Sequence, residues 1–326
     1  MKHVSVMLVA VVILTGCGRQ EAPLSSTPVP ISAPPPVVAA TQQFASLVTA
    51  RQGFQTKLNP AQSEKVPPDV PPPEVFQIVH YDSPAGKLAS YLTPNPQDGQ
   101  KHPAIVWITG GDCNTIGNVW EEAPPENDQT ASAFRQAGIV MMFPSLRGGN
   151  DNPGVREGLL GEVDDVIAAA DFLARQDYVD PGRIYLGGHS TGGTLVLLVA
   201  ECSDKFRAIF SFGPVHNVAG YGPEYTPFDR SNLREFELRS PGLWLATIKN
   251  PTFVFEGTGQ GNLVALQMLS RASLNPLLKC LPVDGADHFS VLAPTTKLIA
   301  DRVLQDTGPT CTLMFTEDEL KRPFGK

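Results

Sequence analysis

The stretch Arg183-Ile-Tyr-Leu-Gly-Gly-His-Ser-Thr-Gly-Gly-Thr194 is a short apolar strand that runs into the turn Gly188-His-Ser-Thr-Gly192. A G-x-S-x-G turn between a strand and a helix is a nucleophile elbow. The turn projects the Ser190 hydroxyl out of the backbone toward a base, and its two glycines let strand and helix approach each other. The apolar run from Thr194 to Ala200 predicts the helix that follows. We therefore expect Ser190 to be a catalytic nucleophile.

Eight short apolar runs, rich in β-branched residues, predict eight strands. The first two alternate in polarity around a turn at 82–86, which indicates an antiparallel hairpin. The later runs are continuously apolar, as in strands that are covered on both faces. The predicted strands are Val75–Tyr81, Lys87–Thr93, Ala104–Thr109, Ile139–Phe143, Arg183–Gly187, Arg207–Phe212, Thr252–Glu256 and Leu278–Val283.

Helical patterns lie between the later strands, and the clearest runs from Glu157 to Arg175. An antiparallel start followed by alternation of strand and helix makes a mostly parallel sheet with helices on both faces. The expected fold class is therefore α/β, with eight strands in the sheet.

The residues from 75 to about 305 resemble the α/β-hydrolase fold, with the elbow serine after the fifth strand. The run Asp165–Gly193 is most similar to prolyl-oligopeptidase-type and dienelactone-hydrolase-type members. The resemblance implies a serine hydrolase that cleaves an ester or amide, a small ester or a short peptide, through an acyl-enzyme intermediate. It also implies a small lid segment at 214–244, where aromatic residues either hold part of a substrate or pack against the body. It implies no cofactor. A carboxylesterase and a peptidase stay open as alternatives, because both use the same elbow.

A base is needed for the serine, and in this fold the chain order is serine, acid, histidine. His288 follows the last predicted strand and precedes a helix, where the family places its histidine. Its neutral imidazole would accept the serine proton and later return it to the leaving group. His189, inside the elbow, is expected to line the site or to pack beside it.

The acid of the triad is less evident, because Gln260 stands where the family usually has an aspartate. Glutamine cannot supply the negative charge that stabilises an imidazolium. Glu256, at the end of the seventh strand, is the nearest carboxylate and is our expected acid. Asp284 and Asp287, on the histidine's own loop, and a dyad without an acid remain as alternatives.

The oxyanion hole is expected to combine the amide of Thr191 with an amide from the loop after the third strand, either Gly111 or Asp112. Glycine in that loop lets backbone amides approach a developing oxyanion. Arg147, in the loop after the fourth strand, either contacts the substrate or pairs with carboxylates such as Glu162 or Asp164.

The chain starts with Lys2 and an apolar stretch from Val4 to Leu14, which is too short to span a bilayer and is typical of a secretory signal. The stretch ends at Leu14-Thr-Gly-Cys17, which resembles the lipobox of bacterial lipoproteins. The resemblance implies removal of residues 1–16 and lipidation of Cys17. With Gly18 after the cysteine, it favours the outer membrane, with the protein facing the periplasm or the cell surface.

Twelve prolines lie between Gln20 and Pro73, which disfavours helix and sheet and predicts an extended tether over residues 17–73. The apolar segment Phe44–Leu58 interrupts it and could form a helix or dock on the domain. Residues 74–326 are expected to form one catalytic domain. The net charge of −8, without basic clusters, gives no reason to expect nucleic-acid binding.

Four cysteines follow Cys17, and they either form disulfides or stay as buried thiols. They are Cys113, Cys202, Cys280 and Cys311. No C-x-x-C or His/Cys cluster suggests a metal. A non-catalytic envelope protein that retains the hydrolase fold is the alternative function, because fold alone does not establish activity.

Overall fold

The structure, a computed structural model, describes residues 45–121 and 123–325. The eight strands form one sheet in the order β1-β2-β4-β3-β5-β6-β7-β8. β2 pairs antiparallel with β1 and with β4, and the strands from β4 to β8 pair in parallel. The strands are β1 (Gln77–Ser83), β2 (Gly86–Leu92), β3 (His102–Ile108), β4 (Val140–Pro144), β5 (Val179–His189), β6 (Ile209–Phe212), β7 (Thr252–Gly257) and β8 (Leu278–Val283).

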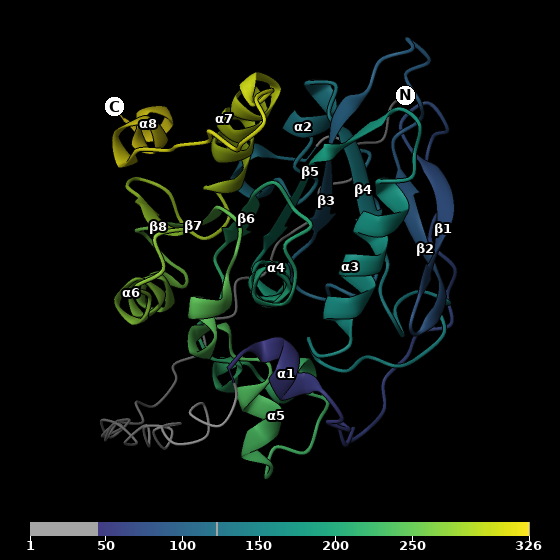
Figure 1. The fold of residues 1–326 in the computed structure, drawn as a ribbon, viewed down its shortest axis with the longest axis vertical. Helices are drawn as coiled ribbons and strands as arrows, with labels where there is room; N and C mark the ends of the chain where they lie inside the picture. Colours follow the sequence, from purple (N-terminus) through teal and green to yellow (C-terminus); the bar gives the residue numbers. More distant parts are fainter. Residues whose placement is uncertain (1–44, 122, 326) are drawn as a thin grey trace, which may run out of the picture. The chain divides into compact units, whose positions relative to one another are not determined.

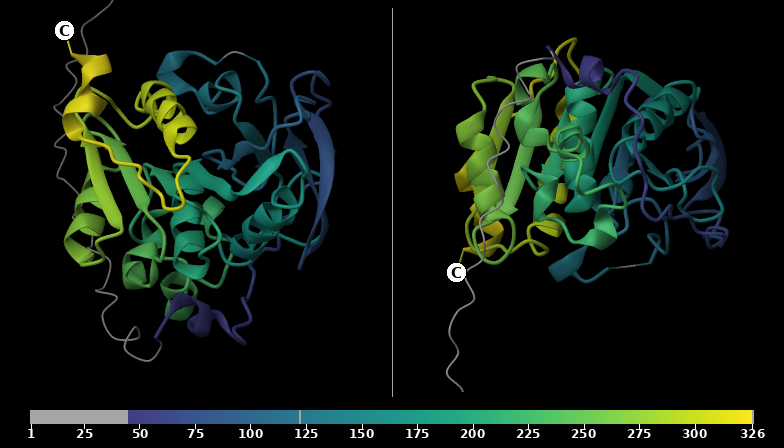
Figure 2. Two further views of the ribbon diagram at one scale, coloured as in Figure 1. Left: turned by 45° about the horizontal axis from the view of Figure 1, so that its top comes forward. Right: turned by 90° about the horizontal axis from the view of Figure 1, so that it is seen from below.

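Two apolar cores lie on the two faces of this sheet. Alternate side chains of β3 divide between them, with Val106 and Ile108 in one core and Ile105 and Trp107 in the other. The first face is covered by α3 (Glu162–Leu173), α4 (Thr191–Cys202) and α6 (Leu263–Ala272) (Figure 1). The second is covered by α2 (Ala133–Gln136) and α7 (Leu292–Gln305), and α8 (Glu317–Lys321) adds to its core beside β8 (Figures 1 and 2). The predicted fold class is confirmed.

The helix α3 begins at Glu162, five residues later than the sequence pattern predicts. Gly158 and Leu159 adopt φ angles of 64° and 75°, which a right-handed helix cannot accommodate. Three acidic residues occupy the first turn of α3, where the helix dipole favours negative charge. The turn at 157–161 therefore forms a separate loop before the helix.

The expected lid segment forms a set of short helices between β6 and β7. Phe228 and Trp244 are buried, so these aromatic side chains pack against the body, whereas Tyr225 is 38% exposed. Tyr221 and Tyr225 line a pocket that is described below. The helices are η3 (Val218–Gly220), η4 (Pro223–Tyr225), α5 (Leu233–Glu237), η5 (Pro241–Leu243) and η6 (Leu245–Thr247).

Residues 45–66, which we name the N-terminal strap, run along the lid segment and α3. The strap starts with the short helix α1 (Leu47–Arg51), capped by the Ser46 side chain. The Arg51 guanidinium donates to both carboxylate oxygens of Asp164 on α3, at 3.1 and 2.8 Å. Figure 1 shows α1 beside α5 of the lid segment. The apolar segment that the sequence singles out thus forms a helix and docks.

The docking shortens the expected tether. Leu58 pairs with Phe228 in an isolated β-bridge, and the Tyr91 hydroxyl donates to the Asp69 carbonyl at 2.7 Å. A proline-rich segment lacks many of the backbone N–H groups that strand pairing needs. Its carbonyls and the side chains between the prolines can still bind the domain. Residues 45–73, which the sequence placed in the tether, thus contact the domain through these bonds. The remaining tether residues, 17–44, and the expected signal, 1–16, lie outside the described residues.

The four cysteines of the domain are free thiols. Burial raises the pKa of Cys113 far above its ordinary value and that of Cys202 to about 12. A thiol reacts as the thiolate, so both are held in an unreactive form. The cysteines are therefore free thiols in place of disulfides, with Cys113 buried and the other three partly buried.

The strap is joined to the lid segment through the Glu235 carboxylate, which also forms a buried ion pair with Arg239. Arg239 and Glu235 side chains are both fully buried, with 2.6 Å between Nη1 and Oε2. Glu235 also accepts hydrogen bonds from the Thr56 hydroxyl and the Lys57 amide, both at 2.9 Å. One carboxylate thus holds the lid helix α5 and the strap together.

Replacing Glu235 with leucine should lower the free energy of unfolding by about 3–5 kcal/mol, because Arg239 would be left buried and unpaired. Urea denaturation followed by circular dichroism measures this change. Lys57→Gln is the matched control, since the Lys57–Asp229 ion pair is exposed on the same strap and should matter much less. Equal stability of the two variants would contradict the assignment of Glu235.

Candidate active site

The elbow has the strained backbone that the motif requires. Ser190 joins β5 to α4 with φ 55° and ψ −114°, an unusual conformation for a residue with a side chain. Its amide donates to the Phe212 carbonyl of β6 at 2.7 Å. A Cβ on Gly192 would lie 2.6 Å from the Thr109 carbonyl oxygen, so only glycine fits beside β3. These contacts hold the Ser190 side chain out of the turn.

The structure brings Glu256 and His288 together at the same edge of the sheet. Glu256 lies in β7 and is fully buried, and His288 lies in the loop after β8 with 13% of its side chain exposed. The His288 Nδ1 atom is 3.2 Å from Oε2 and 3.3 Å from Oε1 of Glu256. With Nδ1 donating to the carboxylate, Nε2 is the nitrogen that can accept a proton.

Two residues that the sequence analysis missed support this pair. Gly213 leaves space for it, and Asn262 donates hydrogen bonds around it. A Cβ on Gly213, which has φ 56°, would lie 2.5 Å from both His288 Nδ1 and Glu256 Oε2. The backbone N–H of Asn262 donates to Glu256 Oε1 at 3.1 Å, and its side-chain amide donates to the Gly213 carbonyl at 2.8 Å. The glycine directly after β6 was a sequence signal that could have pointed to Gly213. No sequence signal pointed to Asn262.

The other carboxylates that the sequence offered do not contact the His288 ring. Asp287 accepts hydrogen bonds from the Ser290 and Phe289 amides, at 2.8 and 3.0 Å, and these lower its pKa. Asp284 is exposed. Gln260 is exposed too, and only its carbonyl serves the site, accepting from the His288 amide at 2.8 Å.

His189 packs beside the pair, which is one of the two positions expected for it from the sequence. Its Nε2 lies 2.9 Å from the His288 carbonyl and its Nδ1 lies 2.7 Å from Gln129 Nε2. The carbonyl accepts, so Nε2 carries the proton and Nδ1 accepts from the Gln129 amide. Burial, with the nearby His288, lowers the pKa of His189 to about 3. This histidine is therefore a neutral spacer under the His288 loop.

The loop after β3 lies against the elbow. A Cβ on Gly110 would be 3.2 Å from the Ser190 Cβ, and the Thr191 hydroxyl donates to the Gly111 carbonyl at 2.7 Å. Thr191 is the first residue of α4, so its amide has no acceptor within the helix. The Asp112 carboxylate turns away to Arg156, at 2.7 Å, which leaves only its backbone for an oxyanion. The predicted oxyanion residues are thus neighbours, and their role stays a prediction.

Arg147 pairs with carboxylates and stiffens its loop. It donates from Nε and Nη2 to the two oxygens of Asp165, both at 2.9 Å, and from Nη1 to Glu157 at 2.6 Å. These partners differ from Glu162 and Asp164, the examples that the sequence suggested. The side chain is buried by these contacts. It holds the loop after β4 against α3.

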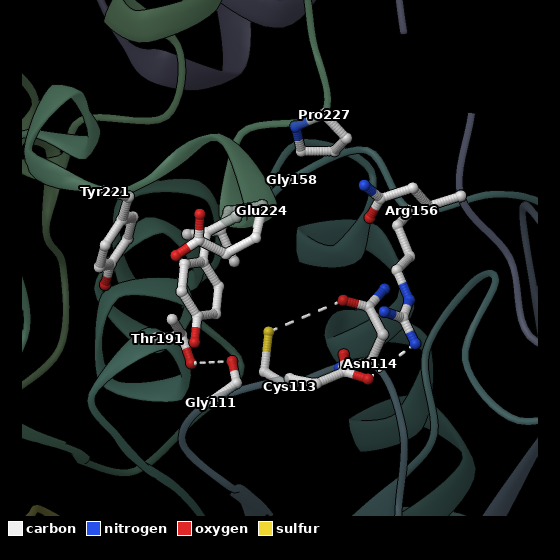
Figure 3. Close-up of a pocket in the computed structure, with 13 residues that line it drawn as sticks. Gly111, Cys113, Asn114, Arg156, Gly158, Thr191, Tyr221, Glu224 and Pro227 are labelled. Atoms are coloured by element: carbon white, nitrogen blue, oxygen red, sulfur yellow. Dashed lines mark hydrogen bonds and ion pairs between the residues drawn. The ribbon is translucent and has the colours of Figure 1, made fainter. Parts of the chain in front are cut away.

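A pocket opens beside the elbow, between the loop after β3, the turn at 156–159 and the lid segment (Figure 3). Its cavity measures about 230 Å³. Thr191 and Gly111 form one end of it, and the strap contributes Gln62. The lining residues are Gln62, Gly111, Asp112, Cys113, Asn114, Arg156, Gly158, Leu159, Thr191, Tyr221, Glu224, Tyr225 and Pro227.

Within residues 45–121 and 123–325, no group of three His, Cys, Asp or Glu side chains could hold a metal ion. In the same part of the chain, no helix has both the length and the apolar character needed to cross a membrane. Cys17 lies outside the described residues.

The strand order and the elbow are those of the α/β-hydrolase fold, and Glu256 and His288 lie at hydrogen-bond distance within it. Residues 125–270 match the model of the prolyl oligopeptidase family, Peptidase_S9. This region contains the elbow and Glu256. The match agrees with the serine hydrolase expected from the sequence.

Similar proteins include two longer peptidases. Prolyl oligopeptidase A of Amanita bisporigera is 32% identical over 139 residues, which are 40% of this chain and 17% of that protein. Dipeptidyl peptidase 8 of Homo sapiens is 29% identical over 171 residues, 49% of this chain and 18% of that protein. The chain thus matches less than a fifth of the length of these relatives.

Solved structures with the same fold include a peptidase and an esterase. A puromycin-hydrolyzing peptidase of Mycobacterium tuberculosis has a TM-score of 0.56 at 20% identity, over 71% of this chain and 39% of that one. A Pyrobaculum calidifontis esterase has a TM-score of 0.51 at 17% identity, over 71% of this chain and 85% of that one. At such identities the similarity concerns the fold.

We predict that Glu256→Gln slows the reaction of Ser190 with a fluorophosphonate and lowers kcat on a p-nitrophenyl ester by about 10³- to 10⁴-fold, because the amide cannot stabilise the His288 imidazolium. Gln260→Ala should cost much less. Asp284→Asn and Asp287→Asn are the matched carboxylate controls and should keep near-normal rates. If one of these two loses activity while Glu256→Gln keeps it, the acid lies on the histidine loop. If none of the three carboxylates matters, Ser190 and His288 act as a dyad.

Proposed function

We propose that the protein is a serine hydrolase that cleaves a small ester or an amide, short peptides included, through an acyl-enzyme intermediate. The observation that carries this proposal is the buried Glu256 carboxylate at 3.2 Å from Nδ1 of His288, beside a strained nucleophile elbow. A pair of this kind fixes the tautomer of the imidazole and stabilises its cation. The match of residues 125–270 to the prolyl oligopeptidase family supports the same class of reaction.

The chemistry follows from these positions. Ser190 Oγ attacks the carbonyl carbon while Nε2 of His288 takes the hydroxyl proton. The resulting oxyanion would be bound by the Thr191 amide and by an amide of Gly111 or Asp112. His288 then gives the proton to the leaving alcohol or amine, and the C–O or C–N bond breaks. Water, deprotonated by His288, then attacks the acyl carbon, the C–O bond to Ser190 breaks, and His288 returns the proton to Ser190 Oγ as the acid leaves.

The size of the pocket favours a small substrate group. A cavity of about 230 Å³ lies below the usual range of about 300–1,000 Å³ for ligand pockets. The strap, through Gln62, and the lid segment both line it, and so they limit the size of the group that can enter. The chain matches only a small part of its longer relatives, so their substrates are no guide to its own.

We also propose that the mature protein begins at a lipidated Cys17 and is held at the outer membrane of a bacterial envelope. The support is the sequence pattern Leu14-Thr-Gly-Cys17 after the apolar segment. The proline-rich residues 18–44 would then act as the spacer between the membrane and the strap.

Ser190→Ala should abolish labelling by a fluorophosphonate and lower kcat by several orders of magnitude, because no other group in the site can form the acyl-enzyme. Gel fluorescence and assays on p-nitrophenyl esters and aminoacyl amides measure both effects. Labelling that persists in the variant would contradict the nucleophile. A wild-type protein that is neither labelled nor active would favour the alternative, a non-catalytic envelope protein with this fold.

Cys17→Ser should block lipidation and normal processing, because the thiol is the expected site of the lipid. Intact-mass analysis of the wild-type protein from membranes should show loss of residues 1–16 and added acyl mass. Cys202→Ser is a matched control that should leave processing unchanged. An unmodified mature N-terminus at another residue would refute this assignment.

A further inference from the structure

The charges in the pocket beside the elbow are unbalanced. Arg156 is its only cationic lining residue, and its Nη2 lies 2.6 Å from Glu64 of the strap and 2.7 Å from Asp112. Two carboxylates therefore share this one guanidinium. Glu224 is the second carboxylate of the lining, beside Asp112, and within residues 45–121 and 123–325 it forms no ion pair. The pocket as a whole carries negative charge.

Glu224 is available to a ligand. It is exposed, and among the residues that the structure describes it forms neither a hydrogen bond nor an ion pair. Its carboxylate lies on the side of the pocket where Tyr221 stands, and Arg156 lies on the opposite side (Figure 3). The side chain folds back over Gly222, where a Cβ would lie 2.5 Å from Oε1. A carboxylate placed in this way can pair with a cation that enters the pocket.

Two aromatic rings accompany Glu224. Tyr221 and Tyr225 lie with their ring centroids 5.7 Å apart and both line the pocket. The Tyr221 hydroxyl is held by the Thr194 hydroxyl at 2.7 Å, which fixes that ring, and Tyr225 is 38% exposed. Aromatic faces attract ammonium groups, and a carboxylate beside them adds a direct counter-charge.

We propose that this pocket binds an ammonium group of the substrate, with Glu224 as its counter-ion and the two tyrosines around it. The inference rests on the proposed hydrolase function and deepens it, because it names the substrate class: esters or amides that carry a primary amine. Thr191 and Gly111, at the pocket's end, place this group close to the carbonyl under attack. The amine is either the α-amino group of an amino acid or the end of a lysine-like side chain.

Four p-nitroanilides separate these two sources. Norleucine p-nitroanilide, with a free α-amine, is compared with its N-acetyl form. N-acetyl-lysine p-nitroanilide, with a free side-chain amine, is compared with N-acetyl-norleucine p-nitroanilide, which lacks that amine. Below pH 7 both amines are largely protonated. We expect wild-type protein to have a kcat/KM at least about fivefold higher for the ammonium member of one pair.

Glu224→Gln should reduce that preference to within about twofold, because the neutral amide removes the counter-charge of the ammonium group. Glu74→Gln is the matched control, because it removes the same charge from an exposed glutamate outside the pocket, and it should keep the preference. The ratio between two substrates is measured on one preparation, so partial misfolding of a variant cannot produce the result.

Several outcomes overturn the inference and leave the hydrolase function standing. They are a wild-type protein that cleaves charged and neutral members equally, a Glu224→Gln variant that keeps the preference, and a protein labelled by fluorophosphonate that cleaves none of the four. Absence of labelling in wild-type protein contradicts the proposed function itself, and this inference with it.

Discussion

The backbone strain at Ser190 is the constraint on which the rest of this structure depends. A residue with φ 55° at a strand-to-helix junction is unstable by itself, and its neighbours must hold it. The Phe212 carbonyl binds its amide, and β3 approaches so closely that position 192 accepts only glycine. The parallel order of β3, β5 and β6 creates both contacts. The sheet thus holds the Ser190 side chain out of the turn, where the residue is only partly buried.

The carboxylate that contacts His288 is a glutamate from within a strand, and its length and burial shape the surroundings of the histidine. Glu256 is longer than an aspartate and is fully buried, so it needs space and hydrogen-bond donors around it. Gly213 supplies the space, and the Asn262 amide supplies a donor at 3.1 Å. The turn that follows, with Gln260, is left to hold the His288 backbone instead of its ring.

The pocket is lined by residues that lie far apart in the chain, and the N-terminal strap is one of the segments that contribute to it. Through Glu64 it takes up the charge of Arg156, and through Thr56 and Lys57 it binds the buried carboxylate of the lid helix. The strap therefore reaches the pocket beside the elbow, which it lines with Gln62. Such an arrangement ties access to the site, and its charge, to residues that precede the hydrolase fold.

The sequence alone determined the eight strands, the elbow and the positions of Ser190 and His288, because periodicity and turn chemistry act over a few residues. It also favoured Glu256, although Asp284 and Asp287 stayed open. Only the tertiary structure decided which carboxylate contacts the imidazole, that residues 45–73 pack instead of spanning solvent, and that Arg156 is neutralised while Glu224 is not. Those outcomes depend on distances between residues that lie far apart in the chain, and a local sequence pattern does not predict such distances.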